Sequence, residues 1–179
     1  MTDPIFFDSD CFSSFIWVKR EDILLNLYSG KIVIPEPVLK EISNPTIPHI
    51  RDKAQELIRG GQITTSEILI NSEEYKYYYE LTSQSQPGAK IIGKGEASAL
   101  SLARVYKATI ASNNLSDVVS YVKKHKLKHI TTAYILVKAC KDGIISETKG
   151  NDIWKGMIDR NRKMPCSSFS DFLKQCKLK

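Results

Sequence analysis

The sequence of 179 residues lacks any run of about eighteen apolar residues, the length that a helix needs to cross a bilayer. Acids lie near the N-terminus, where no basic stretch precedes an apolar one, so no secretory signal is predicted. The four cysteines form no Cys-x-x-Cys motif and have no histidine at zinc-finger spacing. We therefore expect a soluble, cytoplasmic protein without membrane contacts, whose cysteines are reduced thiols with no metal role.

Two enzyme signatures are also missing. There is no Gly-x-Ser-x-Gly motif, and Gly93-Lys94-Gly95 is too short and wrongly continued for a phosphate loop or a dinucleotide fingerprint. A serine hydrolase or a nucleotide-binding domain is therefore poorly supported. No internal repeat is visible either, so a repeat array is not expected.

Basic residues are in excess and unevenly distributed. The net charge is +6 and the isoelectric point is about 9.1. The segment 148–179 holds eight bases and three acids, and a second basic cluster covers 123–129. A solvated surface is the common explanation for such runs, whereas binding of RNA phosphates is the functional one. The candidate RNA-binding residues are Lys123, Lys124, Lys126, Arg160 and Arg162.

The hydrophobic pattern alternates between strands and helices. Strands are predicted at 5–7, 31–34, 109–112 and 128–131, with a brief extended piece at 62–65. Helices are predicted at 11–18, 22–28, 36–43, 50–59, 72–81, from 93 onwards, 118–124, 133–141, 153–162 and 169–176, and a polar loop at 82–90. This alternation indicates an α/β fold with a mainly parallel central sheet flanked by helices. We expect one domain over residues 1–147 and a basic helical C-terminal extension over 148–179.

Acidic and amide side chains fall at comparable places in this pattern. They follow strands or lie on the helices next to them: Asp8, Asp10, Glu41, Glu96, Asn113, Asn114 and Asp117. Strand ends and helix starts on one rim of a parallel sheet would bring the carboxylates together. Converging carboxylates repel one another unless a hard dication neutralises them, and oxygen ligands suit Mg²⁺ or Mn²⁺. Such a site activates water for attack on a phosphodiester, which points to a nuclease.

Each acid also has an ordinary structural explanation. Asp8 or Asp10 can cap the helix that follows the first strand. Glu41 can be an exposed helix residue paired with a neighbouring base, and Glu96 a favourable charge at a helix N-terminus. Asp117 can be a plain surface residue.

Four motifs in order resemble one known family. They read Ile-Phe-Phe-Asp-Ser-Asp, Ile-Val-Ile-Pro-Glu-Pro-Val-Leu-Lys-Glu-Ile, Gly-Lys-Gly-Glu-Ala-Ser-Ala-Leu and Thr-Ile-Ala-Ser-Asn-Asn, and they lie between Ile5 and Gly143. In this order they resemble the PIN-domain ribonucleases, many of which are toxins of toxin–antitoxin pairs. The resemblance implies a Rossmann-like PIN fold, a Mg²⁺ or Mn²⁺ site on the carboxyl rim of the sheet, and RNA as substrate. It also implies two protein partners, a cognate antitoxin and a second copy in a homodimer.

Carried over by position, the family pattern makes Asp8, Glu41 and Glu96 the catalytic, metal-binding acids. Ser9 would hold the Asp8 carboxylate or a water molecule. Asp10 is expected to be a cap or a residue that supports the ligands.

The fourth position departs from the family pattern. The chain has Ser112, Asn113 and Asn114 where the family usually has an acid. The side-chain oxygen of Asn114 can bind a metal but neutralises none of its charge. Asp117 lies one helical turn beyond and could supply the missing catalytic and metal-binding carboxylate, with Ser112 and Asn113 in supporting positions.

Two functions follow. The first is a metal-dependent endoribonuclease, plausible as a toxin, that cuts single-stranded or looped RNA. The second is a non-catalytic PIN-like module that binds RNA or a protein, which the weakened fourth position favours.

Overall fold

The computed structural model describes residues 3–83 and 91–177. Its strands are β1 (Ile5–Phe7), β2 (Ile32–Pro35), β3 (Thr64–Ser66), β4 (Thr109–Ala111) and β5 (Lys128–Ile130). Its helices are α1 (Ser9–Trp17), α2 (Glu21–Tyr28), α3 (Glu36–Ile42), α4 (Pro48–Arg59), α5 (Glu73–Thr82), α6 (Lys94–Val105), α7 (Leu115–His125), α8 (Thr132–Lys141), α9 (Glu147–Asp159) and α10 (Phe169–Lys177). Most of the loop expected over 82–90 falls on residues 84–90, which lie outside the described part.

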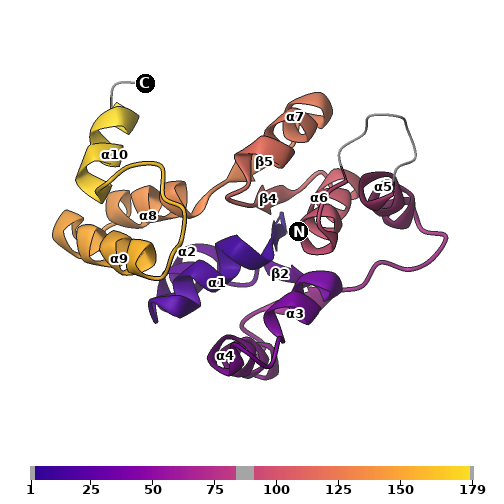
Figure 1. The fold of residues 1–179 in the computed structure, drawn as a ribbon, viewed down its shortest axis with the longest axis horizontal. Coiled ribbons are helices and arrows are strands. Elements are labelled where there is room, and N and C mark those ends of the chain that lie inside the picture. The colour runs from indigo at the N-terminus through magenta and orange to yellow at the C-terminus, as the bar shows by residue number, and fades with distance from the viewer. Residues whose placement is uncertain (1–2, 84–90, 178–179) are drawn as a thin grey trace.

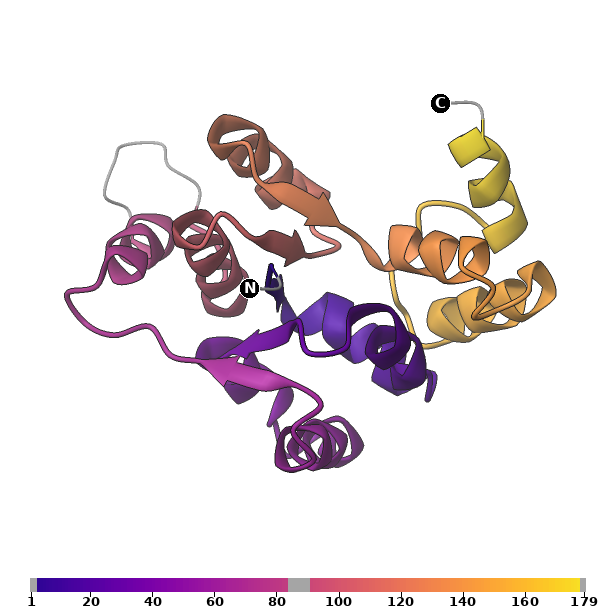
Figure 2. The ribbon, with the colours of Figure 1, turned by 180° about the vertical axis from the view of Figure 1, so that it is seen from behind.

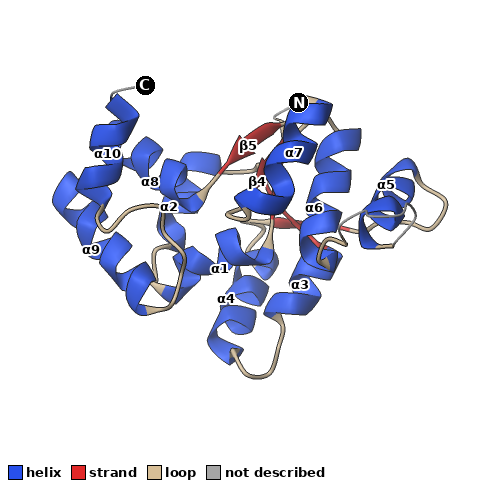
Figure 3. Cartoon of the chain, turned by 45° about the horizontal axis from the view of Figure 1, so that its top comes forward, coloured by secondary structure: helices blue, strands red, loops and turns tan. Residues whose placement is uncertain are grey.

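The strands form one parallel sheet in the order β3-β2-β1-β4-β5, with helices on both faces (Figure 1, Figure 3). This confirms the predicted α/β fold. From β1 the chain moves outward through β2 and β3, and then returns to continue on the other side through β4 and β5. The direction reverses between β1 and β4, which pair from Ile5 with Thr109 to Phe7 with Ala111. In open parallel sheets, sites form beyond the carboxyl ends of strands at such a switch point.

Side chains of β1 alternate between two cores, as the pleat of a strand requires. Ile5 and Phe7 belong to a large core that also includes residues of α1, α2 and α8. Phe6 points into a smaller core formed mainly with α6. Burial on both faces explains why this strand is a continuous apolar run, and it fixes the backbone that leads to Asp8.

Two helices begin three or more residues earlier than the apolar pattern predicted. Helix α9 starts at Glu147 because the Ser146 hydroxyl caps it by accepting a hydrogen bond from Lys149 N at 3.1 Å. Its first turn is polar, so hydrophobic periodicity could not reveal it. Helix α7 starts at Leu115, whose side chain is exposed, whereas Val118, where the apolar pattern begins, is buried.

The two C-terminal helices pack against α8 and extend the large core (Figure 2). Trp154 is fully buried, with ring centroids 5.8 Å from Phe169 and 5.5 Å from Phe172. Gly150 allows the Phe169 ring to approach, because a Cβ atom there would collide with it. The boundary expected between residues 147 and 148 stays a prediction. Across the described ranges, no helix combines the length and the apolar character that a bilayer crossing requires.

Candidate functional site

Asp8 lies between β1 and α1, at the carboxyl end of the central strand. Its Oδ1 accepts a hydrogen bond from Cys11 N at 2.6 Å, so Asp8 is the N-cap of α1. Its backbone N–H donates to the Ala111 carbonyl of β4 at 2.9 Å. The structural explanation for this aspartate therefore holds, and the same contacts fix its carboxylate at the switch point.

The Asp8 carboxyl group is an unusual cap because it is 4% exposed. Burial raises its pKa to about 7, even though contact with the Ser112 hydroxyl and the hydrogen bond from Cys11 N lower it. The negative charges of Asp10 and Glu96 raise the pKa further. Burial beside Asp8 also raises the pKa of the Cys11 thiol, which opposes any nucleophilic role for this cysteine.

Ser112 connects the acids at the end of β4. Its hydroxyl donates to Glu96 Oε1 at 3.2 Å, lies in hydrogen-bond contact with Asp8, and accepts from Asn114 N at 3.2 Å. Asn114 Nδ2 donates to Glu96 Oε2 at 3.0 Å. Asp8, Glu96 and Asn114, three of the residues that we predicted from sequence, are thus joined through one buried serine.

Glu41 reaches the same rim from α3. Its Oε1 accepts a hydrogen bond from Gly95 N at 2.8 Å, in the first turn of α6 and one residue before Glu96. A Cβ atom on Gly95 would collide with the Glu41 carboxylate, so glycine is required for this approach. Glycine is costly inside a helix, so a glycine at the second position of α6 is a signal in the sequence for a close contact of this kind. Lys40 pairs with Glu36 instead of Glu41.

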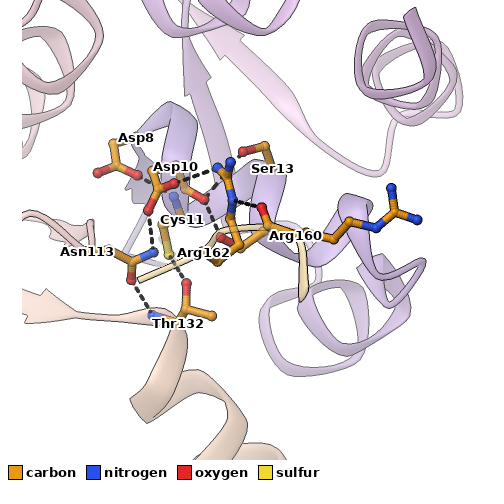
Figure 4. A network of polar contacts seen from close by, with 9 residues as sticks. Asp8, Asp10, Cys11, Ser13, Asn113, Thr132, Arg160 and Arg162 are labelled. Atoms are coloured by element: carbon orange, nitrogen blue, oxygen red, sulfur yellow. Dashed lines mark hydrogen bonds and ion pairs between the residues drawn. The ribbon is translucent and has the colours of Figure 1, made fainter. Parts of the chain in front are cut away.

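Asp10 lies in a second network beside this cluster (Figure 4). Its Oδ2 accepts from Asn113 Nδ2 at 2.8 Å, and Asn113 Oδ1 accepts from Thr132 N at 2.9 Å. On the other side, Arg162 Nη1 donates to Asp10 Oδ1 at 2.9 Å. Asp10 therefore ties α1 to the loop before α7, and also to the segment that follows α9.

Other predicted residues lie near the site or away from it. Asp117 is the third residue of α7, and its side chain is outside the description. Lys123, Lys124 and Lys126 are exposed around the far end of α7; with a rise of about 1.5 Å per residue, Lys123 lies about 13 Å along the helix from Asn114. The Arg160 side chain extends away from Asp10 (Figure 4).

Ser9 is half-buried on the first turn of α1, while the hydroxyl that contacts Asp8 is that of Ser112. A further residue was missed as part of the site. Nε2 of His129, on β5, lies 2.8 Å from the Ser112 carbonyl oxygen. In the sequence this histidine belongs to the basic cluster 123–129, because lysines surround it.

The atoms that could bind a metal at the carboxyl ends of the strands are oxygens. Carboxylates of Asp8 and Glu96 with the amide oxygen of Asn114 are chemically suited to Mg²⁺ or Mn²⁺ rather than to a soft metal. Burial is the main cause of the raised pKa of Asp8, and the charges of Asp10 and Glu96 add to it, so a cation bound at this rim would favour the ionised carboxylate. Within residues 3–83 and 91–177, however, no three His, Cys, Asp or Glu side chains lie close enough together to form a metal-binding group. The oxygen atoms of Asp8, Glu96 and Asn114 nevertheless fit a hard dication.

Comparison with known proteins agrees with this geometry. A family model described as a PIN domain matches residues 4–177, which is nearly the whole chain and includes the C-terminal helices. A search of curated proteins finds no match. PIN domains are generally nucleases and generally use divalent metals, so the family relationship indicates a nuclease-type fold. The parallel sheet, the acids at its switch point and this match together show that the chain belongs to the PIN-domain family.

Proposed function

We propose that this protein is a Mg²⁺- or Mn²⁺-dependent endoribonuclease that hydrolyses phosphodiester bonds in single-stranded or looped RNA. The observation that carries the proposal is the contact of one buried serine with two acids: Ser112 lies between Asp8 and Glu96 at the switch point of the sheet. These polar and acidic side chains lie beyond the carboxyl ends of the strands at the switch point, which is where open parallel sheets form their active sites.

In this proposal Asp8, Glu96, Asn114 and Asp117 would hold the metal, which supplies positive charge at the scissile phosphate and lowers the pKa of water. The Ser112 hydroxyl and the Asn114 amide orient the Glu96 carboxylate through their hydrogen bonds. Gly95 N–H anchors one oxygen of Glu41, which leaves the other oxygen to orient a water molecule and to accept its proton. Cys11 N–H keeps the Asp8 carboxylate facing the rim.

The experiment is cleavage of a mixed structured RNA with Mn²⁺, with Mg²⁺ or with EDTA, by the wild type and by Asp8→Asn. Asparagine caps helices about as well as aspartate, so the variant keeps α1 while it loses the charge. Asp52→Asn is the control, because Asp52 is exposed on α4 and pairs with its neighbour Arg51. We expect metal-dependent cleavage that is lost in Asp8→Asn and retained in the control. Equal cleavage by all three proteins would refute the proposal.

The partners are part of the same proposal. The resemblance to toxin PIN proteins supports a cognate antitoxin, a homodimer and a cytoplasmic location. Co-purification of a tagged chain with the product of the neighbouring gene, followed by light scattering of each species, tests the first two. A monomer that no neighbouring product binds would refute both.

One observation favours the alternative function, a non-catalytic RNA- or protein-binding module. The amide of Asn114 occupies a position next to Glu96 where the family usually has an acid, and the described residues form no group of three metal-binding side chains. Calorimetric titration with Mn²⁺ separates the two functions. Uptake of Mn²⁺ that Asp8→Asn weakens supports the nuclease, whereas RNA binding without Mn²⁺ uptake supports the module.

A further inference from the structure

Three hollows on the surface follow one another from the start of α7 to the end of α1. The first, of about 530 Å³, lies between Asn113 and Asn114 on one wall and Arg162 and Lys163 on the other. The second, of about 250 Å³, shares Asp10 and Arg162 with the first and is also lined by Glu41 and Trp17. The third, of about 320 Å³, shares Trp17 with the second. We call this series of hollows the basic groove.

Bases outnumber acids in the first and third hollows of the basic groove, whereas the second holds Arg162 together with Asp10 and Glu41. Arg162 and Lys163 line the first hollow, where Asp10 is the acid. The third hollow is lined by one acid, Asp152, and by several bases: Lys19, Arg20, Lys149 and Arg160. Groups of cations on either side of an acidic site match the phosphates of a chain that passes across it. Most of these residues come from the segment beyond residue 148 or from the end of α1, which the sequence pattern did not connect.

Trp17 supplies an aromatic surface between the second and third hollows. It is half-buried at the end of α1, and its ring centroid lies 4.3 Å from that of His49 in an edge contact. The Arg160 guanidinium carbon lies 5.6 Å from the Trp17 centroid. A cationic groove that includes an aromatic ring is the composition that binds single-stranded nucleic acid, because bases stack on the ring while cations follow the backbone.

Arg162 is held in place at the junction of the first two hollows. Nη1 donates to Asp10, and Nε donates to the Arg160 carbonyl at 3.2 Å. A guanidinium has five N–H donors, so these two contacts orient the group and leave donors for a phosphate. The Arg162 side chain is 24% exposed, which makes it accessible from the groove.

We propose that the basic groove binds a single strand of RNA, with Arg162 and Lys163 on its phosphates and the Trp17 ring stacked on a base. The proposal rests on the function proposed above, for which it identifies the substrate-binding surface. It also assigns the segment after α9 to that surface. A duplex, whose bases are stacked and paired, cannot place a base on Trp17 and should bind more weakly.

The test is fluorescence anisotropy of a labelled oligouridine of about ten nucleotides, measured in EDTA over a series of salt concentrations. Arg162→Gln and Lys163→Gln should each bind more weakly and reduce the slope of log affinity against log salt by about 0.7. Lys155→Gln is the matched control, because Lys155 is exposed on α9, the helix just before Arg162 and Lys163, but lines none of the three hollows. Equal slopes in all four proteins, or a hairpin duplex that binds as tightly as the oligouridine, would overturn the proposal.

Asp10→Asn separates a phosphate contact from a structural role of Arg162. If Arg162 only held the segment after α9 against α1 through its ion pair with Asp10, this variant would break the same contact and lose as much slope as Arg162→Gln. With Arg162 on a phosphate, Asp10→Asn keeps the wild-type slope.

Tryptophan emission tests the stacking directly. Trp154 is fully buried, so quenching of emission by the oligouridine reports on Trp17. We expect quenching in the wild type and none in Trp17→Phe; quenching that persists in Trp17→Phe would contradict the stacking. Because binding is measured without metal, its result is independent of cleavage. If Arg162→Gln and Lys163→Gln reduce the salt slope of RNA binding but no protein cleaves RNA, only the proposed nuclease activity is refuted. If cleavage depends on Asp8 but the salt slopes of these variants equal that of the wild type, only the proposed RNA-binding groove is refuted.

Discussion

The charge of Asp8 should destabilise the folded protein at neutral pH. The carboxyl group is 4% exposed, and its pKa rises from 3.8 to about 7 on burial. The folded state therefore holds the Asp8 proton more tightly than the unfolded state. Asp8→Asn removes the titrating group while it keeps an acceptor for Cys11 N. We expect this variant to be more stable than the wild type when Asp8 is ionised.

The sign follows from proton linkage. Below about pH 4 the carboxyl group is protonated in both states, so it contributes no pH dependence. Between about pH 4 and pH 7 the unfolded state loses this proton and the folded state keeps it, so the free energy of unfolding falls as pH rises. Above pH 7 the penalty is constant, and a pKa shift of this size corresponds to roughly 4 kcal/mol at most.

The assay is urea unfolding of the wild type, Asp8→Asn and the surface control Asp52→Asn in EDTA at pH 4.5, 6 and 8. Contributions of the other titrating groups cancel in the differences between proteins. The advantage of Asp8→Asn over the wild type should be small at the lowest pH and largest, by a few kcal/mol, at the highest. A difference that does not grow with pH, or a wild type that is the more stable protein at pH 8, would refute the reasoning.

Three further predictions concern single contacts. Gly95→Ala should lower metal-dependent RNA cleavage about tenfold or more, because the added Cβ would displace the Glu41 carboxylate. Helix content should be retained, because alanine favours a helix, and unchanged cleavage would contradict this prediction. Trp154→Ala should cost about 3–5 kcal/mol in urea unfolding because it opens a cavity where the C-terminal helices join the core; a loss below about 1 kcal/mol would mean that this extension is dispensable for the fold. Asn114→Asp replaces a hydrogen-bond donor to Glu96 with a like charge, so it should lower the melting temperature in EDTA. Adding Mn²⁺ should then raise the melting temperature of this variant by more than it raises that of the wild type. An equal rise in both proteins would exclude a metal beside residue 114.

Local sequence determined most of the fold. The apolar run that forms β1 is buried on both faces, and its abrupt polar end places Asp8 as cap of α1. Ser168 and Asp171 have the spacing of a helix cap, and the Ser168 hydroxyl accepts from Asp171 N at 3.1 Å and donates to Asp171 Oδ2 at 2.7 Å. Periodicity missed the first turn of α9 because that turn presents polar residues.

The sequence by itself determined that this is a parallel α/β protein of the PIN family, with acids at the end of the first strand and at the start of α6, because period and order are local properties. The tertiary structure decided how those acids are held. Glu41 meets Gly95 and Arg162 meets Asp10 only because distant segments fold onto one rim. The raised pKa of Asp8 is also tertiary, since it arises from burial and from charges on other elements. Hydrogen bonds, burial and electrostatic coupling between distant segments depend on the packing of the whole chain, which no single stretch of sequence records.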